Sequence, residues 1–127
     1  MNAIESVLSG SSAIRLTRDN TEYIVAHSEI LYFESGDNRV YAHTKDALYT
    51  APYTLSNLEH LLPHNFVRVS KSCIVNVMHI ARLRRELVGN GEIGFTDSDK
   101  ITYFSRTCYK RLYEKIEEMR LHHYEKQ

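Results

Sequence analysis

The sequence has 127 residues, of which 43% are hydrophobic and 25% are charged, and its 16 basic and 16 acidic residues give a formal net charge of zero. This length suits one domain with a buried core, and the composition excludes a disordered or fibrous protein. No run approaches the roughly 18 apolar residues that a membrane span requires, and residues 1–10 lack the pattern of a signal peptide. We therefore expect a cytoplasmic protein.

The charges are unevenly distributed along this neutral chain. Residues 66–85, FVRVSKSCIVNVMHIARLRR, contain five basic residues and no acidic one. Near the C-terminus, by contrast, acidic residues gather at Glu114, Glu117, Glu118 and Glu125. A neutral total weakens the simplest argument for nucleic-acid binding, which looks for a strongly basic domain. Local charge still allows one positive face and one negative face.

Most of the chain alternates short apolar segments with turn signals. Residues 1–12 have no periodicity, and we expect an N-terminal tail or a short docking helix there. Strands are expected at residues 13–18, 22–26, 30–34, 39–44, 47–51, 66–69, 73–77, 80–88, 92–96 and 101–104. Asp19-Asn20, residues 35–38 and Gly89-Asn90-Gly91 separate pairs of these strands, which predicts hairpins.

Two segments have helical periodicity instead. Residues 54–62 place four leucines on one face, with Thr54 as a suitable N-cap and Pro63 at the end, which predicts a short helix against a sheet. Residues 107 to about 121 predict a C-terminal amphipathic helix, whose apolar face is formed by Tyr109, Leu112, Tyr113, Ile116 and Met119. The expected fold is therefore mainly β, built from antiparallel hairpins, with one domain at residues 13–120 and a C-terminal tail at residues 121–127.

The sequence gives little sign of catalysis, of cofactor binding or of a metal site. The string GxGxxG that begins at Gly89 resembles a dinucleotide-binding motif, but no helix follows its glycines, so we expect a hairpin turn. Residues 97–99 lack the glycine and glutamate that complete a calcium loop. The adjacent His122 and His123 point in different directions on a helix. We therefore expect no enzyme activity, no cofactor and no metal.

The two cysteines, Cys73 and Cys108, fit none of the usual zinc spacings and are too few for a disulfide framework. Cysteine commonly behaves as a small buried apolar residue. We therefore expect two reduced thiols in β-structure.

Residues 66–80, FVRVSKSCIVNVMHI, resemble the most characteristic stretch of the LytTR DNA-binding domain, in which a Phe-x-Arg-x strand precedes a polar pair, a serine and a Val-Asn-x-x-x-Ile run. Residues 29–34 (EILYFE), 38–43 (NRVYAH) and 54–61 are similar to strands and a short helix of that family, and residues 101–106 (ITYFSR) to its last strand and an arginine-bearing turn. The resemblance covers about residues 13–117 in the family's order.

This resemblance implies an elongated stack of antiparallel sheets that reads duplex DNA through loops, without a recognition helix. Three loops at one edge enter successive grooves in the family, and their base-contacting positions correspond to Asn38 and Arg39, to Lys71 and to Arg106. Arg offers a fork for guanine, Asn can pair with adenine, and Lys adds a donor and a charge. Arg106 lies near the start of the C-terminal helix, where a cation opposes the helix dipole, which favours an outside anion as its partner.

Each of these residues also has a purely structural alternative: Lys71 and Arg106 as exposed side chains, and Asn38 as a turn residue that tolerates left-handed backbone. Three further DNA-binding candidates are Arg68, which contacts a phosphate or forms an internal salt bridge, and Ser70 and Ser72, which bind phosphate or cap the bend between strands. Phosphate contacts at most are expected at Arg82, Arg84 and Arg85.

The sequence departs from the commonest form of the family in two ways. It has no room for an N-terminal receiver domain, so it resembles free-standing members that are restrained by a small inhibitory membrane protein. Lys71 also stands where some members carry Asn, which leaves open the base that this loop reads.

These observations predict a sequence-specific regulator of transcription that binds double-stranded DNA at promoter direct repeats, as a homodimer on DNA, with RNA polymerase as a further candidate partner. The alternative is a protein-interaction module of the same fold, which acts through a regulator or a membrane partner. The neutral charge and the acidic C-terminal helix lend that alternative slight support. A weaker third hypothesis is a single-strand or RNA binder that stacks bases on Tyr32, Phe33 or Tyr41.

Overall fold

The computed structural model describes the backbone of residues 12–126 and the side chains of residues 12–120. The strands of this part are β1 (Ala13–Arg18), β2 (Thr21–Ala26), β3 (Ile30–Gly36), β4 (Arg39–Thr44), β5 (Leu48–Ala51), β6 (Phe66–Ser70), β7 (Cys73–Asn76), β8 (Ile80–Arg84), β9 (Gly91–Phe95) and β10 (Ile101–Phe104). Its helices are α2 (Leu55–Leu61), α3 (Tyr109–Lys126) and the 3₁₀ helices η1 (His27–Glu29), η2 (Val77–His79) and η3 (Arg106–Cys108). The predicted mainly β fold with two helices is confirmed.

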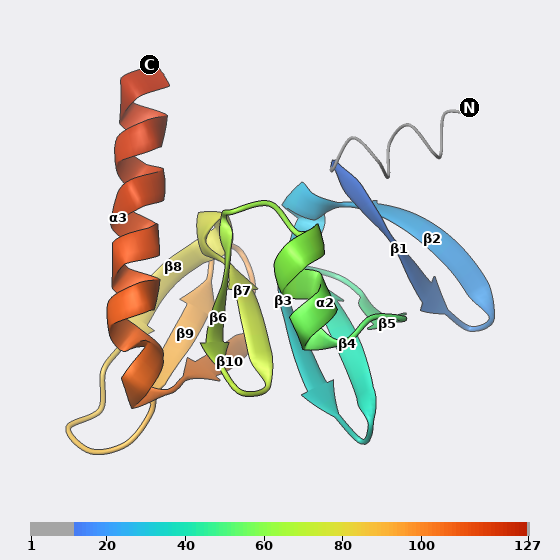
Figure 1. The fold of residues 1–127 in the computed structure, drawn as a ribbon, viewed down its shortest axis with the longest axis horizontal. Coiled ribbons are helices and arrows are strands. Elements are labelled where there is room, and N and C mark those ends of the chain that lie inside the picture. The colour runs from blue at the N-terminus through green and yellow to red at the C-terminus, as the bar shows by residue number, and fades with distance from the viewer. Residues whose placement is uncertain (1–11, 127) are drawn as a thin grey trace.

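The strands form two antiparallel sheets. The larger sheet has seven strands in the order β2-β1-β5-β4-β3-β7-β6, and the smaller sheet has three in the order β10-β9-β8. Within the larger sheet, β3 pairs with β7 between Tyr32 and Val75 and between Glu34 and Cys73. This pairing joins the two N-terminal hairpins to the hairpin of residues 66–76. The sheets follow one another along the long axis, and α3 stands at the opposite end from the β1–β2 hairpin (Figure 1).

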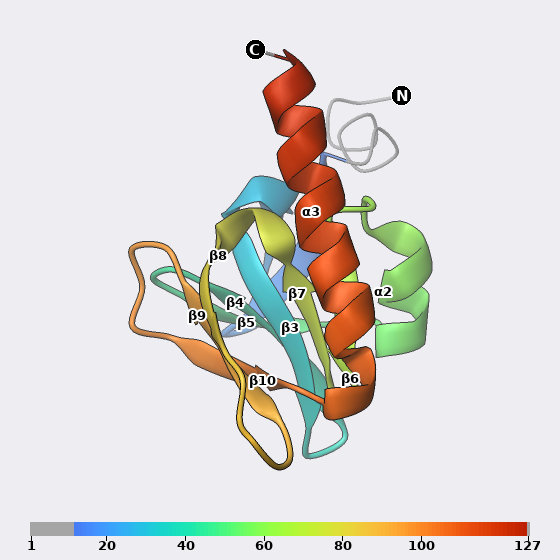
Figure 2. The same cartoon turned by 90° about the vertical axis from the view of Figure 1, so that its left-hand side faces the viewer.

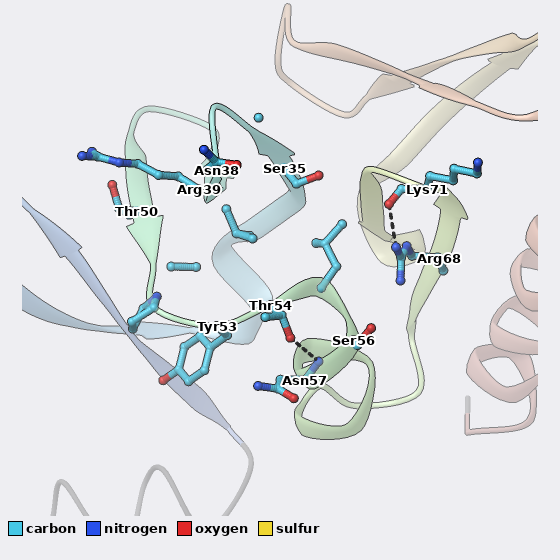
Figure 3. Close-up of a pocket in the computed structure, with 15 residues that line it drawn as sticks. Ser35, Asn38, Arg39, Thr50, Tyr53, Thr54, Ser56, Asn57, Arg68 and Lys71 are labelled. Atoms are coloured by element: carbon cyan, nitrogen blue, oxygen red, sulfur yellow. Dashed lines mark hydrogen bonds between the residues drawn. The ribbon is translucent and has the colours of Figure 1, made fainter.

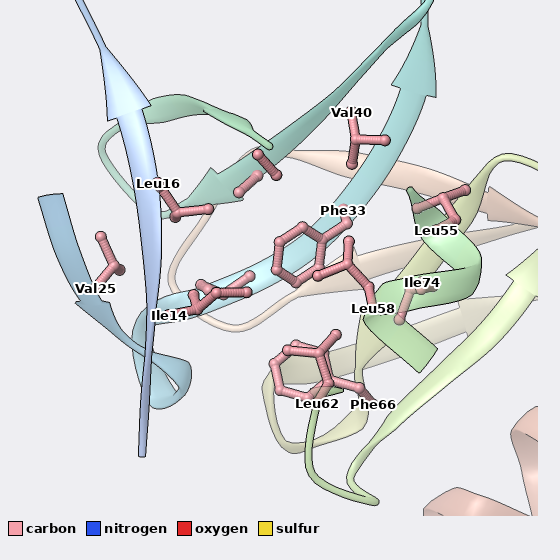
Figure 4. Close-up of a cluster of buried hydrophobic side chains, with 13 residues drawn as sticks. Ile14, Leu16, Val25, Phe33, Val40, Leu55, Leu58, Leu62, Phe66 and Ile74 are labelled. Atoms are coloured by element: carbon pink, nitrogen blue, oxygen red, sulfur yellow. The ribbon is translucent and has the colours of Figure 1, made fainter. Parts of the chain in front are cut away.

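Two clusters of buried side chains use opposite faces of β3, β6 and β7, because successive residues of a strand point to opposite faces. The first cluster packs α2 against the larger sheet and includes Phe33, Leu58 and Ile74 (Figure 4). The second lies where the larger sheet, the smaller sheet and α3 meet, and it includes Val69 and Leu112. The two helices therefore cover different clusters.

The first two hairpins close with two-residue turns of the same conformation. Asp19 and Asn20 have φ values of 51° and 62°, and Asp37 and Asn38 have the same pair of values. Asp and Asn adopt this left-handed conformation more readily than other residues with a side chain, and it matches the twist of a hairpin. Both predicted hairpins are confirmed, and the second turn is narrower than the predicted residues 35–38.

Both predicted helices form, with differences in extent. Thr54 caps α2, since its side-chain oxygen accepts a hydrogen bond from the Asn57 backbone N–H at 3.0 Å. Leu61, however, is 51% exposed rather than buried, because the helix ends at that residue. The last helix starts at Tyr109 after η3 and runs to Lys126, so most of the predicted C-terminal tail is helical. Tyr113 is 49% exposed, although its predicted face is otherwise packed against the second cluster.

The predicted strand of residues 80–88 is too long. In the structure β8 ends at Arg84, which pairs with Glu92, and residues 85–90 form a loop. The predicted tight Asn-Gly turn does not form, because Gly91 is the first residue of β9. A Cβ atom at Gly91 would come within 2.0 Å of the Phe104 ring, so this glycine is needed for packing. The glycine-rich string is part of a hairpin, as expected.

The two cysteines differ in environment. Cys73 is buried in β7, and burial raises the pKa of its thiol to about 12. Cys108 is half-buried and lies in η3, so the expectation that it lies in β-structure was wrong. Cys108 lies beyond the end of β10, in the 3₁₀ helix that leads into α3.

Candidate nucleic-acid interface

The three predicted DNA-contacting loops lie at one edge of the molecule. Figures 1 and 2 show the β3–β4 turn, the β6–β7 turn and the start of α3 at the same lower edge in both views. Backbone hydrogen bonds join them: the Ser35 N–H donates to the Ser72 carbonyl at 2.8 Å, and the Ser105 N–H donates to the Val69 carbonyl at 2.8 Å. We call these three segments, the Asp37-Asn38 turn, the Lys71-Ser72 turn and η3, the loop edge.

An open groove of about 790 Å³ lies between the first two turns and the N-terminal end of α2 (Figure 3). Its lining brings together four of the predicted site residues, Asn38, Arg39, Arg68 and Lys71. The lining residues include three cations and no carboxylate. A groove with this composition favours an anion.

Two of these cations are available to a ligand. Arg39 and Lys71 are exposed, and neither forms a salt bridge with a described residue. Asn38 is exposed as well, and its left-handed backbone shows that it also serves the turn, as its structural alternative predicted. These three side chains can therefore offer hydrogen-bond donors from neighbouring turns.

Arg68 is engaged within the protein. Its Nη1 lies 3.2 Å from Glu59 Oε2, its Nε donates to the Ser70 carbonyl at 2.8 Å, and its Nη2 donates to the Lys71 carbonyl at 2.6 Å. Of the two alternatives for this residue, the internal salt bridge is present. The Ser70 hydroxyl accepts a hydrogen bond from the Ser72 N–H at 3.2 Å, so Ser70 also caps this bend.

Arg106 lies outside the groove, farther along the loop edge. It is exposed in η3, one turn before α3, and lines a separate depression of about 320 Å³ together with Arg85 and Lys110. The structure thus brings six of the seven predicted residues to the β3–β4 turn and the β6–β7 hairpin, and it places Arg106 apart from them.

Two of the three arginines in β8 and the loop after it, Arg84 and Arg85, have partners within the protein. Arg84 lies 3.4 Å from Glu86 and 3.2 Å from Glu92, and Arg85 stacks over the Tyr109 ring at 4.2 Å.

At the tip of the loop between β8 and β9, Leu87 and Val88 are 102% and 84% exposed. Sequence reasoning gave no role to these two apolar side chains, or to Ser56 and Asn57 of α2, which line the groove. The polar residues between the leucines of α2 could have indicated that this side of the helix faces a groove or solvent.

Below its turn, the β3–β4 hairpin carries a half-buried histidine. His43 Nε2 lies 2.6 Å from Glu34 Oε1, and its ring stacks on Tyr32 at 4.2 Å between centroids. Its Nδ1 is buried and has no hydrogen-bond partner among the described residues. Burial lowers the pKa of His43, and Lys100 lowers it further, against the opposing effect of Glu34. Tyr32 and Phe33 are both buried, which leaves the stacking hypothesis with Tyr41 alone.

In the part of the chain that the structure describes, no group of three or more His, Cys, Asp or Glu side chains is arranged to hold a metal ion. No helix among these residues is long and apolar enough to cross a lipid bilayer.

The chain matches the family described as the LytTr DNA-binding domain over residues 20–117. It is 32% identical over 98 residues to proteins described as uncharacterized HTH-type transcriptional regulators from Staphylococcus aureus strains NCTC 8325 and COL. That alignment covers 77% of this chain and 66% of each relative, so the chain spans about two thirds of their length. Among solved structures, the LytTr DNA-binding domain of a Bacillus cereus protein, described as a methyl-accepting/DNA response regulator, is similar with a TM-score of 0.75 and 24% identity, over 83% of this chain and 96% of that one.

The matched segment contains β2 to β10, α2, the first nine residues of α3 and the whole loop edge. Five strands separate α2 from α3, so the described residues hold no helix-turn-helix despite the wording used for the relatives. The fold is that of a LytTr domain. The predicted resemblance is confirmed, and the chain belongs to the LytTr DNA-binding domain family.

Proposed function

We propose that this protein is a sequence-specific regulator of transcription that binds double-stranded DNA along its loop edge. The observation that carries the proposal is the groove that Asn38, Arg39 and Lys71 line from two neighbouring hairpins, with no carboxylate among its lining residues. Family membership supports DNA as the anion. In this proposal residues 13–120 form the DNA-binding unit, which lies in the cytoplasm and has no catalytic role.

Arg39, Lys71 and Arg106 supply the contacts that choose a sequence, together with Asn38. Arginine can donate two hydrogen bonds to a guanine, and asparagine can pair with an adenine. Ser72 lies on the same turn as Lys71 and binds a phosphate, which positions the protein without selecting a base. Since Arg106 stands apart from the groove, we infer that it enters a different groove of the duplex from Lys71.

Two copies bind promoter direct repeats on one side of the duplex, about one or two helical turns apart. A homodimer on DNA, contact with RNA polymerase and control by a small inhibitory membrane protein belong to the same proposal. The second candidate function is a protein-interaction module of this fold. The exposed Leu87 and Val88 favour it, because apolar side chains at a loop tip are suited to contact with another protein.

The test is selection of duplexes from a random DNA library, followed by titration of the protein with the selected duplex and with a scrambled duplex of equal length. We expect the selected duplex to bind at least about 1,000-fold more tightly at physiological salt, which is the lower end of the range for specific DNA-binding proteins. Equal affinities would overturn the proposal and favour the interaction module.

A further inference from the structure

The guanidinium of Arg68 is directed at the backbone of the β6–β7 turn. Its Nε and Nη2 donate to two successive carbonyls, those of Ser70 and Lys71, at 2.8 and 2.6 Å. Its Nη1 lies 3.2 Å from the carboxylate of Glu59 on α2. The Arg68 side chain is only 23% exposed. All three nitrogen atoms therefore have partners within the protein (Figure 3 shows the bond to Lys71).

The turn needs such support because the strand ladder is irregular there. Arg68 pairs with Ile74 and Ser70 pairs with Cys73, a shift in register of the kind a β-bulge produces. A bulge locally disrupts the ladder and leaves backbone groups without ladder partners. The arginine fork provides two donors in a fixed geometry for these carbonyls.

We propose that Arg68 is a positioning residue, not a DNA contact, and that the Glu59–Arg68 pair sets the direction in which the Lys71 side chain projects from the β6–β7 turn. This inference rests on the proposed function and adds a part that α2 plays in it. Glu59 comes from the helix whose first turn lines the opposite wall of the groove, through Thr54, Ser56 and Asn57. The pair thus links the two walls and fixes the groove's width.

Charge leads to the same assignment. Glu59 offsets the charge of Arg68, so the groove owes its net positive charge to Arg39 and Lys71. A phosphate at Arg68 would have to displace a carboxylate and two carbonyls. If Arg68 contacted DNA, removal of Glu59 would strengthen binding to every duplex, since an acid near the DNA would be gone. If Arg68 positions Lys71, removal of Glu59 weakens binding to the selected duplex only. The two roles therefore predict opposite changes in affinity for the selected duplex when Glu59 is removed.

The experiment compares Glu59→Ala with the unmodified protein on the selected and the scrambled duplex, over a series of salt concentrations. We expect at least a tenfold loss of affinity for the selected duplex, no loss for the scrambled duplex, and an unchanged dependence of affinity on salt, since no phosphate contact is removed. Glu22→Ala is the control, because it also removes a glutamate that is paired with an arginine, Arg15 at 3.4 Å, but in the β1–β2 hairpin, where the pair is more exposed. This control should leave both affinities unchanged.

Arg68→Lys is the second variant, since it keeps the charge but loses the fork. It should also lose at least fivefold affinity for the selected duplex, and combining it with Lys71→Ala should add little to the loss caused by Lys71→Ala alone. Binding of the selected duplex at unchanged or higher affinity in both single variants overturns the inference. Failure of the proposed function looks different, because then the unmodified protein would not distinguish the two duplexes.

Discussion

The β3–β4 turn and the β6–β7 turn line the same groove, but different interactions hold them in place. Among the described residues other than glycine, positive φ values occur only at Asp and Asn, two of which form the β3–β4 turn. The β6–β7 turn has no such residue and depends on hydrogen bonds that the Arg68 side chain donates and one that the Ser70 hydroxyl accepts. The first turn is therefore encoded by its own two residues, whereas the second depends on a strand and a helix. Remote substitutions should disturb Lys71 more than Asn38.

The largest expected effect comes from the far end of the β6–β7 hairpin. Asn76 is buried, and its side chain accepts from Asn65 Nδ2 at 2.8 Å and from the Met78 N–H at 3.0 Å, and donates to the Ile30 carbonyl at 3.0 Å. Asn76→Ala should lower the free energy of unfolding by about 3 kcal/mol, because buried polar groups lose their partners. Urea denaturation measures this. Asn57→Ala, at an exposed position, should change it by less than about 0.5 kcal/mol, and equal effects would contradict the assigned role of Asn76.

Substitution of one proposed DNA-contacting side chain in each part of the loop edge compares how much the three segments contribute to DNA affinity. Arg39→Ala, Lys71→Ala and Arg106→Ala should each weaken binding to the selected duplex by about 1–3 kcal/mol, since each removes donors to bases. Fluorescence anisotropy measures the affinities, and thermal unfolding should show an intact fold. Arg15→Ala on β1, away from the loop edge, serves as the control. Equal losses of affinity for the selected and the scrambled duplex would show that these residues contact phosphates and not bases.

A smaller effect separates the two roles of Asn38. Asn38→Ala should destabilise the protein by about 1 kcal/mol, because alanine adopts positive φ less readily. Asn38→Gly should keep the stability and still lose affinity for the selected duplex. Asn20 has the same φ of 62° in the β1–β2 turn, so Asn20→Ala should cost the same stability without affecting DNA binding. If Asn38→Gly bound the selected duplex normally, Asn38 would serve only its turn.

The smallest expected effect is a response of the β3–β4 hairpin to acid. The folded protein holds His43 at a lowered pKa, so the unfolded chain takes up a proton first as the pH falls through about 6.5, the ordinary value for histidine. This contribution to stability is fully present above pH 6.5 and is lost progressively below it. Hydrogen exchange should show faster exchange in β3 and β4 at pH 5.5 than the change in intrinsic rates explains, and His43→Phe should abolish this excess.

Local rules predicted the parts of the fold that are locally encoded. The Asp-Asn turns and the Thr54 cap depend on residues within a few positions, and all of them are present as expected. The β8–β9 loop could not be predicted in this way, because Gly91 is committed to packing beneath Phe104.

The candidate site also has a part that the sequence predicted and a part that it did not. The family resemblance named the residues around the groove, and the fold brings them together. The internal role of Arg68 required knowing that α2 places Glu59 beside it, which no spacing in the sequence reveals. Likewise, the most basic stretch drew attention to Arg84 and Arg85, but nearby acids and the Tyr109 ring occupy these side chains.

The strands that separate the two buried clusters have a consequence for how the protein folds. Phe33 belongs to one cluster and Tyr32 to the other, and the same alternation relates Ile74 to Val75. Neither cluster can form without strands that the other also requires, so heat or urea should unfold both in a single cooperative transition. Many of these pairings join distant parts of the chain, such as Tyr32 with Val75, which favours folding in milliseconds to seconds. The loop edge is therefore complete in every folded molecule and absent from every unfolded one.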